Sequence, residues 1–267
     1  MSRAGYALVI SDAEIQRYMV MAERSRETDG RHWQPAGVVP GAVVADVGCG
    51  PAAFSVVLAS VLGPTGRVIG VERDEQALAA ARQVVAAAGA GNVELRHGDA
   101  ADTGLPNGSV DVVMMRHVLA HNGPDEQRIV DHVAGLVRPG GSVFLVDVDA
   151  TAIRMLNADP DLHDLNARYL ELHRRRGNDL QTGLRLARLL SRAGLTVVLH
   201  EGTYEIVTAA PGMRPPSWAA REAMLAEGVA SPEDVRRWEG ALDRMDVAEP
   251  RPTVFLPQFV AIGAAPA

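Results

Sequence analysis

Hydrophobic residues form two alternating patterns between positions 41 and 150. Short runs rich in valine, isoleucine and leucine alternate with segments whose apolar residues recur every three or four positions. The first pattern is typical of buried strands, and the second pattern is typical of helices that cover a sheet. Such alternation predicts an α/β fold with a parallel, doubly wound sheet. The five predicted strands are Val43–Val47, Arg67–Glu72, Val93–His97, Val110–Met115 and Ser142–Val148.

The segment before residue 41 has a helical pattern of its own. Apolar residues recur at helical spacing from Ile15 to Ala22, after a possible capping box at Ser11–Glu14. Dense charge from Glu23 to Arg31 predicts that this helix gives way to a loop. We expect residues 1–40 to form an N-terminal helical lid in which Tyr18 touches a ligand. A peripheral helix that only packs on the domain fits the pattern equally well.

Beyond residue 150 the alternation loosens. Residues 151–267 are expected to supply the remaining core strands and an inserted helical cap, next to a core formed by residues 41–150. Two strands are predicted there, Leu195–Tyr204 and Thr253–Ile262. Four helices are predicted at Asp161–Arg176, Asn178–Ala193, Pro215–Gly228 and Ser231–Arg244, the last with Ser231 as its N-cap and Pro232 at its first position.

Composition narrows the class of protein. A net charge of −7 argues against a nucleic-acid surface, because phosphates are neutralised by basic residues. The run Arg174–Arg176 is expected to be a solvated helix face. One cysteine, Cys49, excludes an intrachain disulfide and fits a reducing interior as a structural thiol. Residues 1–6 lack the apolar core of a signal peptide, and no apolar stretch reaches membrane-spanning length, so a cytoplasmic protein is expected.

A glycine pair follows the first predicted strand. Gly48 and Gly50 permit backbone conformations that a Cβ forbids, and they let a ligand approach the main chain. Such a turn is where open α/β sheets hold nucleotide-like ligands. Glu72 ends the next strand, where an acid can bind ribose hydroxyls. These features alone suit a nicotinamide dehydrogenase almost as well as any other nucleotide-binding enzyme.

Two further acids argue against a dehydrogenase and for a different ligand. Asp46 stands two residues before Gly48, where a carboxylate would repel a diphosphate but suit a cationic ligand, directly or by orienting the loop. Asp99 ends the third strand. Three carboxylates at one rim suggest a ligand with an ammonium group, ribose hydroxyls and an exocyclic amine, which are the groups of S-adenosylmethionine.

The motifs Asp46–Gly50, Glu72, Gly98–Ala100 and Leu136–Gly141 together resemble the successive motifs of class I S-adenosylmethionine-dependent methyltransferases. The resemblance runs from about Gly41 to Val148. More narrowly, the chain is similar to small-molecule enzymes of the ubiquinone/menaquinone type, an impression to which Arg116–His121 contributes. It implies a Rossmann-like, mostly parallel seven-stranded sheet with an antiparallel last strand, and S-adenosyl-L-methionine as cofactor.

The resemblance also implies site residues. Gly48 and Gly50 would pack against the methionine part of the cofactor, with Asp46 near its amino group. Glu72 would accept both ribose hydroxyls, and Asp99 would bind the adenine amino group. The other residues expected at the cofactor are Arg73 over the adenine face, Gly98 and Ala100 beside Asp99, Tyr18, and Arg116, paired either with the cofactor carboxylate or near Asp99.

Two histidines follow the fourth predicted strand. His121 is the preferred general base and His117 a second catalytic candidate, because imidazole titrates near neutrality. Alternatively, His117 positions the cofactor and His121 caps a local turn. No third metal ligand is evident beside them, so no metal is expected. His173, Arg176, Asn178 and Asp179 form a further cluster, which either caps a helix or faces the acceptor.

The sequence thus predicts methyl transfer to an oxygen or nitrogen of a small, aromatic or hydrophobic metabolite, as in bacterial secondary metabolism. The alternative is a non-catalytic S-adenosylmethionine-binding protein with a structural or regulatory role. A dehydrogenase is the third hypothesis. Neither a nucleic acid nor a membrane is expected as partner, and the sequence leaves a monomer or a homodimer open.

Overall fold

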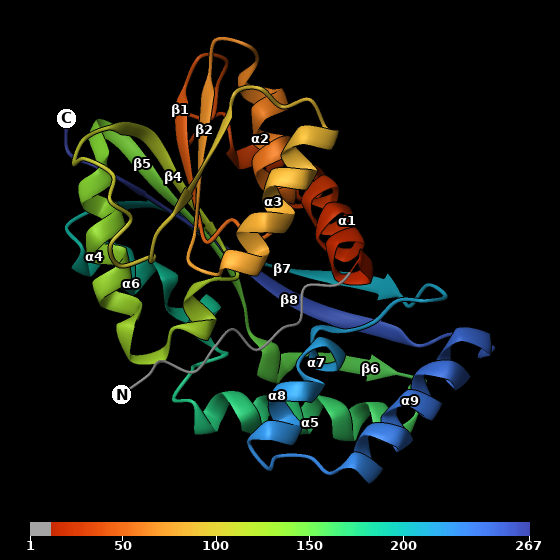
Figure 1. The fold of residues 1–267 in the computed structure, drawn as a ribbon. Coiled ribbons are helices and arrows are strands. Elements are labelled where there is room, and N and C mark those ends of the chain that lie inside the picture. Colours follow the sequence, from red (N-terminus) through yellow and green to blue (C-terminus); the bar gives the residue numbers. More distant parts are fainter. Residues whose placement is uncertain (1–11) are drawn as a thin grey trace.

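The computed structural model describes residues 12–267, and within that range eight strands form one sheet (Figure 1). The strands run in the order β3-β2-β1-β4-β5-β8-β6, and β7 pairs with the other edge of β8. Their bounds are β1 (Val43–Val47), β2 (Arg67–Glu72), β3 (Val93–His97), β4 (Val110–Arg116), β5 (Val137–Val148), β6 (Arg154–Leu156), β7 (Thr196–Thr208) and β8 (Thr253–Ala264).

The predicted mostly parallel sheet with an antiparallel last strand is confirmed. Strands β1 to β5 pair in parallel, and β8 runs antiparallel to β5, β6 and β7. The eighth strand, beyond the predicted seven, is the three-residue β6. Pro257 lies in β8 where the pairing to β6 ends and the pairing to β5 begins, so the ladder on that side is interrupted at a residue without an N–H.

Helices cover both faces of the sheet, as predicted. On one face α1 (Asp12–Thr28) and α2 (Ala53–Leu62) pack on β1 and β4 through a cluster around Leu58 and Phe144. On the other face α4 (Glu126–Leu136) and α6 (Leu186–Arg192) pack around Val113 and Leu145. Helix α3 (Glu75–Ala87) begins at the N-cap Asp74, whose side chain accepts the Ala77 amide.

The prediction of a loop over Glu23–Arg31 was wrong. Helix α1 continues to Thr28 and is followed by a 3-10 turn at Gly30–His32. The charges that suggested a loop are paired along and across the helix: Arg26 with Glu23 at 3.1 Å, and Arg24 with Glu205 of β7 at 2.9 Å. The predicted capping box begins at Ser11, outside the described residues.

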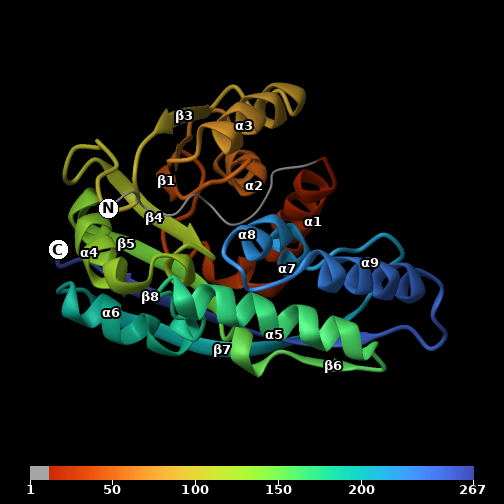
Figure 2. The same cartoon turned by 60° about the horizontal axis from the view of Figure 1, so that its bottom comes forward.

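A second group of helices lies at one end of the sheet, away from α2 and α3 (Figures 1 and 2). It has its own core, in which Trp238 is fully buried. The N-cap predicted at Ser231 is confirmed, and it forms a capping box in which Ser231 and Asp234 bond to each other's backbone. Its members are α5 (Pro160–Arg175), α7 (Pro216–Ala219), α8 (Arg221–Ala226) and α9 (Pro232–Val247).

The helix predicted over 178–193 begins later than expected. A 3-10 turn at Thr182–Arg185 precedes α6, because Asp179 accepts the amide of Gln181 and turns the chain there. No helix among residues 12–267 is long and apolar enough to cross a membrane.

Candidate active site

The turn after β1 is open to a ligand at one glycine and closed at the other. Gly48 has φ +76°, and a Cβ built there would stand 2.5 Å from Val118 Cγ2. Gly50 has φ +54°, and its Cβ would meet no atom within 4 Å. Gly48 is therefore required for packing, whereas the backbone at Gly50 faces free space that a ligand can approach.

Glu72 is fixed beside this turn. Its Oε2 accepts the Gly50 amide at 2.9 Å. Its Oε1 accepts the amides of Arg73 and Asp74 at 2.8 and 2.9 Å. The carboxylate at the end of β2 is thereby held against the glycine turn at the end of β1, as the parallel strands dictate.

Asp99 and Arg73 extend this rim across the neighbouring strands. Asp99, after β3, accepts the Ala101 amide at 2.9 Å. Arg73 Nη1 lies 3.8 Å from Asp99 Oδ2 and donates to Asn122 Oδ1 at 3.1 Å. Because Asn122 follows β4, Arg73 spans the carboxyl edge of the sheet from the end of β3 to the loop after β4.

Asp46 lies inside the protein rather than at the rim. Its side chain is 2% exposed, and Oδ2 accepts the Ser55 hydroxyl of α2 at 2.6 Å. Burial raises the pKa of Asp46 to about 6, partly offset by the Ser55 hydrogen bond. Of the two roles considered for Asp46, this geometry is that of a residue that orients the loop. Burial also raises the pKa of the neighbouring Cys49 thiol, in keeping with a structural role.

Arg116 joins the rim to α1. Its Nη1 donates to the buried Asp29 Oδ2 at 2.6 Å, and its guanidinium lies 4.8 Å from the Phe54 ring. Trp33 Nε1 donates to the same oxygen at 3.0 Å. Arg116 was expected near Asp99 or the cofactor carboxylate, but Asp99 pairs with Arg73 instead. Asp29 was missed because it stands in the charged run that predicted a loop.

Three histidines from two distant segments meet at the other side of the rim. His117 follows β4 with φ +56°, and its amide donates to the Val146 carbonyl at 2.9 Å. His121 ends the 3-10 turn Leu119–His121, and its ring centroid lies 4.9 Å from that of His173 on α5. The Tyr169 ring centroid lies 4.5 Å from that of His173, edge to face. The structure therefore brings both predicted histidines to the junction between the sheet and the second group of helices.

All three imidazoles are neutral at physiological pH. Burial, with the Arg116 charge as the next cause, lowers the pKa of His117 to about 3. Burial lowers the pKa of His121 to about 4, with Arg73 as the next cause. Burial and the neighbouring His121 lower the pKa of His173 to about 3. Each ring can thus accept or donate a hydrogen bond without carrying charge.

Asp147, which the sequence analysis did not single out, supports the turn that carries His121. It ends β5 with 1% exposure and accepts the amides of Ala120 and Val148 at 3.1 and 3.0 Å. Burial raises its pKa to about 7. The signal that could have revealed it was in the sequence, because an acid near the carboxyl end of a strand had already drawn attention to Asp46, Glu72 and Asp99.

Arg17 of helix α1 acts on the histidines through its charge. Its Nε donates to the buried Glu14 at 2.7 Å, and its guanidinium lies 4.7 Å from the Tyr18 ring. The Arg17 charge is one of the causes that lower the pKa of both His117 and His121. Tyr18 packs against the cluster of α1 and α2. Contact of Tyr18 with a ligand stays a prediction.

The cluster after α5 faces the same junction. Asn178 Nδ2 bonds to His173 Nδ1 at 2.9 Å, and Arg176 Nε donates to Glu227 at 2.9 Å. The chain there touches the loop after His121, because a Cβ on Gly123 would stand 2.2 Å from the Gly177 carbonyl oxygen.

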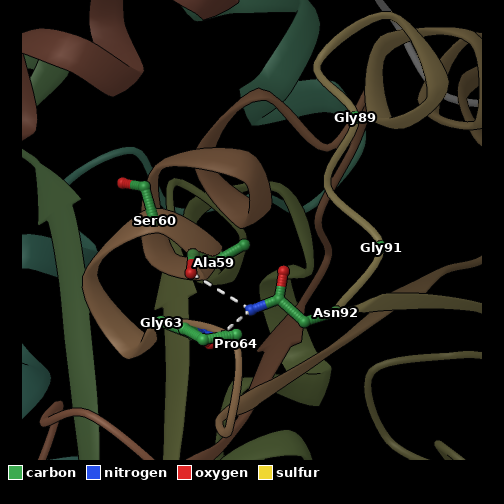
Figure 3. A pocket seen from close by; sticks show the side chains of 7 residues that line it. All are labelled: Ala59, Ser60, Gly63, Pro64, Gly89, Gly91 and Asn92. Atoms are coloured by element: carbon green, nitrogen blue, oxygen red, sulfur yellow. Dashed lines mark hydrogen bonds between the residues drawn. The ribbon is translucent and has the colours of Figure 1, made fainter.

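A surface hollow lies at the opposite edge of the sheet (Figure 3). Asn92, just before β3, crosses it and donates to the carbonyls of Ala59 and Gly63 at 3.1 and 3.0 Å. It contains no predicted site residue. Its lining residues are Ala59, Ser60, Gly63, Pro64, Gly89, Gly91 and Asn92.

The fold is Rossmann-like, and its acids lie at the carboxyl ends of the strands, where such sheets bind nucleoside-type ligands. A family model described as a methyltransferase domain matches residues 44–141. Over residues 44–141 the chain is therefore similar to methyltransferases whose cofactor is S-adenosylmethionine, which confirms the resemblance for this segment.

Curated relatives match less than half of the chain. An arsenite methyltransferase of Halobacterium salinarum is 37% identical over 117 residues, 44% of this chain and 30% of that protein. A demethylmenaquinone methyltransferase of Bacillus cytotoxicus is 34% identical over 110 residues, 41% of this chain and 46% of that protein. The matches thus span less than half the length of these relatives.

Solved structures share the fold over most of the chain. A putative methyltransferase of Bacillus halodurans has a TM-score of 0.61 at 17% identity, covering 90% of this chain and all of that one. A geranyl diphosphate methyltransferase in complex with S-adenosylmethionine has a TM-score of 0.53 at 14% identity, covering 96% and 92%. A [4+2]-cyclase has a TM-score of 0.57 at 15% identity, covering 92% and 82%. These similarities concern the fold.

Proposed function

We propose that the protein transfers a methyl group from S-adenosylmethionine to an oxygen or nitrogen of a small, aromatic or hydrophobic metabolite, in bacterial secondary metabolism. The observation that carries this proposal is the Glu72 carboxylate, fixed at 2.9 Å from the Gly50 amide at the edge of a methyltransferase domain. A cytoplasmic location is part of the proposal and rests on the single cysteine.

The residues at the rim suit the donor. Glu72 is a half-buried acceptor for ribose hydroxyls beside the open backbone at Gly50. Asp99 and the backbone of Gly98 and Ala100 would hold the adenine, with Arg73 over its face. Asp46 would act on the methionine part through Ser55 and the turn, since its carboxylate is buried. When bound, the sulfonium supplies an electrophilic methyl group.

The chain's own contribution to the reaction is alignment and proton removal. Methyl transfer is an in-line displacement, and holding the two reactants in line supplies much of the acceleration. His121 is neutral, so it is in the form that accepts a proton from an acceptor hydroxyl. Its pKa of about 4 makes it a weak base, and proton removal is therefore expected to accompany methyl transfer rather than precede it.

A non-catalytic protein that binds S-adenosylmethionine is the second candidate. The observation that favours it is that burial lowers the pKa of all three histidines that the structure places at the junction, which makes each of them a weak base. In that case the donor site would be intact and no acceptor would be methylated.

Calorimetry with S-adenosylmethionine, S-adenosylhomocysteine and NAD tests the donor site. We expect both adenosyl ligands to bind and NAD not to bind. Binding of NAD without either adenosyl ligand would refute the proposal. Release of S-adenosylhomocysteine in the presence of a panel of phenols and anilines then separates the enzyme from the non-catalytic alternative.

A further inference from the structure

His173 is the most deeply buried of the three histidines at the junction, with 1% of its surface exposed. It belongs to α5, and its ring centroid lies 4.5 Å from that of Tyr169 and 4.9 Å from that of His121. Because His121 belongs to the turn after β4, His173 is one of the residues through which the second group of helices contacts the rim of the sheet. The two ring contacts and the Asn178 hydrogen bond restrict the orientation of its ring.

The proton of His173 can be placed on one nitrogen. Asn178 Nδ2 lies 2.9 Å from Nδ1, and an amide nitrogen only donates. Nδ1 therefore accepts, and the neutral ring carries its hydrogen on Nε2. Burial keeps the ring neutral by lowering its pKa to about 3. His173 thus presents an N–H donor on the edge opposite Asn178.

That donor has no partner within residues 12–267, although it is buried. Buried polar atoms are nearly always hydrogen-bonded, because an unpaired one loses its hydration without compensation. His117 Nε2 is buried and unpartnered in the same part of the chain. Two unpartnered imidazole nitrogens at the same junction indicate that the missing partner is a ligand.

The charges around the junction are already paired. Arg176 bonds to Glu227, Arg17 to Glu14, and Arg73 lies beside Asp99. The groups that point to the ligand are therefore neutral imidazoles rather than cations. A ligand that carries a carboxylate or phosphate would be desolvated there without a dedicated counter-ion, which is costly.

We infer that His173 is a specificity-determining residue whose Nε2–H donates a hydrogen bond to an oxygen of the methyl acceptor, which is an uncharged hydroxyarene. This assignment rests on the proposed function. The Tyr169 and His121 rings supply aromatic surface beside the donor, and His121 is placed to accept the proton of the hydroxyl that receives the methyl group. The acceptor is thereby narrowed from any small metabolite to a phenol-type compound.

The tautomer can be measured without any substrate. Long-range 1H–15N spectra of histidine-labelled protein are expected to show His173 protonated on Nε2 and unchanged in charge from pH 5 to pH 8. In Asn178→Ala this tautomer preference should weaken. A His173 protonated on Nδ1, or one that titrates between pH 5 and pH 8, would overturn the assignment whatever the enzyme does.

Binding then tests the ligand class. Phenol, catechol and hydroquinone are titrated into the protein saturated with S-adenosylhomocysteine, with benzoate as the charged comparison. His173→Phe keeps the ring contact with Tyr169 but removes the donor, and should weaken hydroxyarene binding about fivefold to tenfold, as expected for one hydrogen bond. His173→Gln restores a donor near the position of Nε2 and should recover most of that loss. His163→Phe, at an exposed position of the same helix, serves as control.

The outcomes separate the two claims. No binding of S-adenosylhomocysteine would refute the proposed function, and the assignment with it. S-adenosylhomocysteine binding with none of the hydroxyarenes bound, or with equal hydroxyarene affinity in wild type, His173→Phe and His173→Gln, would refute the assignment alone. Tighter binding of benzoate than of catechol would likewise refute the uncharged ligand class.

Discussion

The donor side and the acceptor side of the candidate site are built differently. On the donor side, contacts join residues close in sequence: Gly50 bonds to Glu72 across 22 positions, and Ser55 to Asp46 across nine. On the acceptor side, His121 meets His173 of a separate helix group. The family model matches residues 44–141, which contain the donor side but not His173.

This difference explains what each side can reveal about function. Backbone amides and strand-end carboxylates make up the proposed donor side, and they lie within the segment that matches the methyltransferase family model. The proposed acceptor side consists of side chains on α1, the turn after β4, and α5, which are far apart in the sequence. Because side chains on such peripheral segments can change without disturbing the sheet, we propose that the second substrate binds there.

Replacing His121 tests the acceptor side most strongly. His121→Ala should lower kcat by about 100-fold to 10 000-fold, the range for loss of a general base, while cofactor affinity stays unchanged. Steady-state kinetics and calorimetry with S-adenosylhomocysteine measure the two quantities. His163→Ala is the control. Normal kcat in His121→Ala would remove it as the base, and a parallel loss of cofactor affinity would show that the two sides are not separable.

Replacing Glu72 tests the donor side. Glu72→Ala should weaken cofactor binding about 100-fold, because the ribose hydroxyls lose a charged acceptor. Glu72→Gln, which keeps one acceptor oxygen, should show an intermediate loss. Glu75→Ala, at an exposed position in the first turn of α3, should bind normally. Wild-type affinity in Glu72→Ala, measured by calorimetry, would mean that the cofactor lies elsewhere.

The difference between local and long-range contacts also explains which features of the structure could be predicted from the sequence. The strands, the N-caps Asp74 and Ser231, and the acids at the strand ends depend on local pattern, and the structure contains each of them. The full length of α1 could not be predicted, because its charges are balanced partly by Glu205 of β7.

The contacts that shape the acceptor side were equally beyond local pattern. Arg116 meets Asp29 across 87 positions, and the tautomer of His173 is set by Asn178 beyond the end of its helix. Asp147 contacts an amide 27 positions away. The Arg116 and Asp147 contacts exist only once the sheet has brought distant segments together, so the hydrophobic pattern of the sequence does not predict them.

Replacing Gly48 should destabilise the turn of the donor side without removing any polar group. Gly48→Ala should lower the free energy of unfolding by about 3 kcal/mol, from its positive φ and from the contact with Val118. Gly89→Ala has a positive φ of 61° and open space around it, so about 1 kcal/mol is expected. Urea unfolding without ligand measures both.

A second substitution isolates the packing part of this loss. Val118→Ala in the Gly48→Ala background should return part of the lost stability, since it removes the methyl group that the new Cβ meets. If Gly48→Ala and Gly89→Ala destabilise equally, only the backbone conformation matters and the close packing at Gly48 contributes nothing.

Replacing Asp147 is expected to give the smallest effect, which is a change in how the free energy of unfolding depends on pH. The pKa of Asp147 is raised from 3.8 to about 7 by burial, so the native state keeps a proton that the unfolded state has lost. Below about pH 4 both states are protonated and there is no effect. As pH rises to about 7, stability falls, because the unfolded state binds fewer protons.

Asp147→Asn removes this fall. The histidines at the junction act in the opposite direction, since their lowered pKa values make stability rise with pH up to about 6.5, but they are present in both proteins and cancel in the difference. Unfolding free energies at pH 5 and pH 8 should therefore show the variant gaining more than about 1 kcal/mol on wild type between the two values, one pKa unit being worth about 1.4 kcal/mol. An unchanged difference would mean that Asp147 is already ionised at pH 5. In that case an ionised Asp147 carboxylate holds the turn that carries His121. The donor side and the acceptor side would then be coupled electrostatically, contrary to the separation argued above.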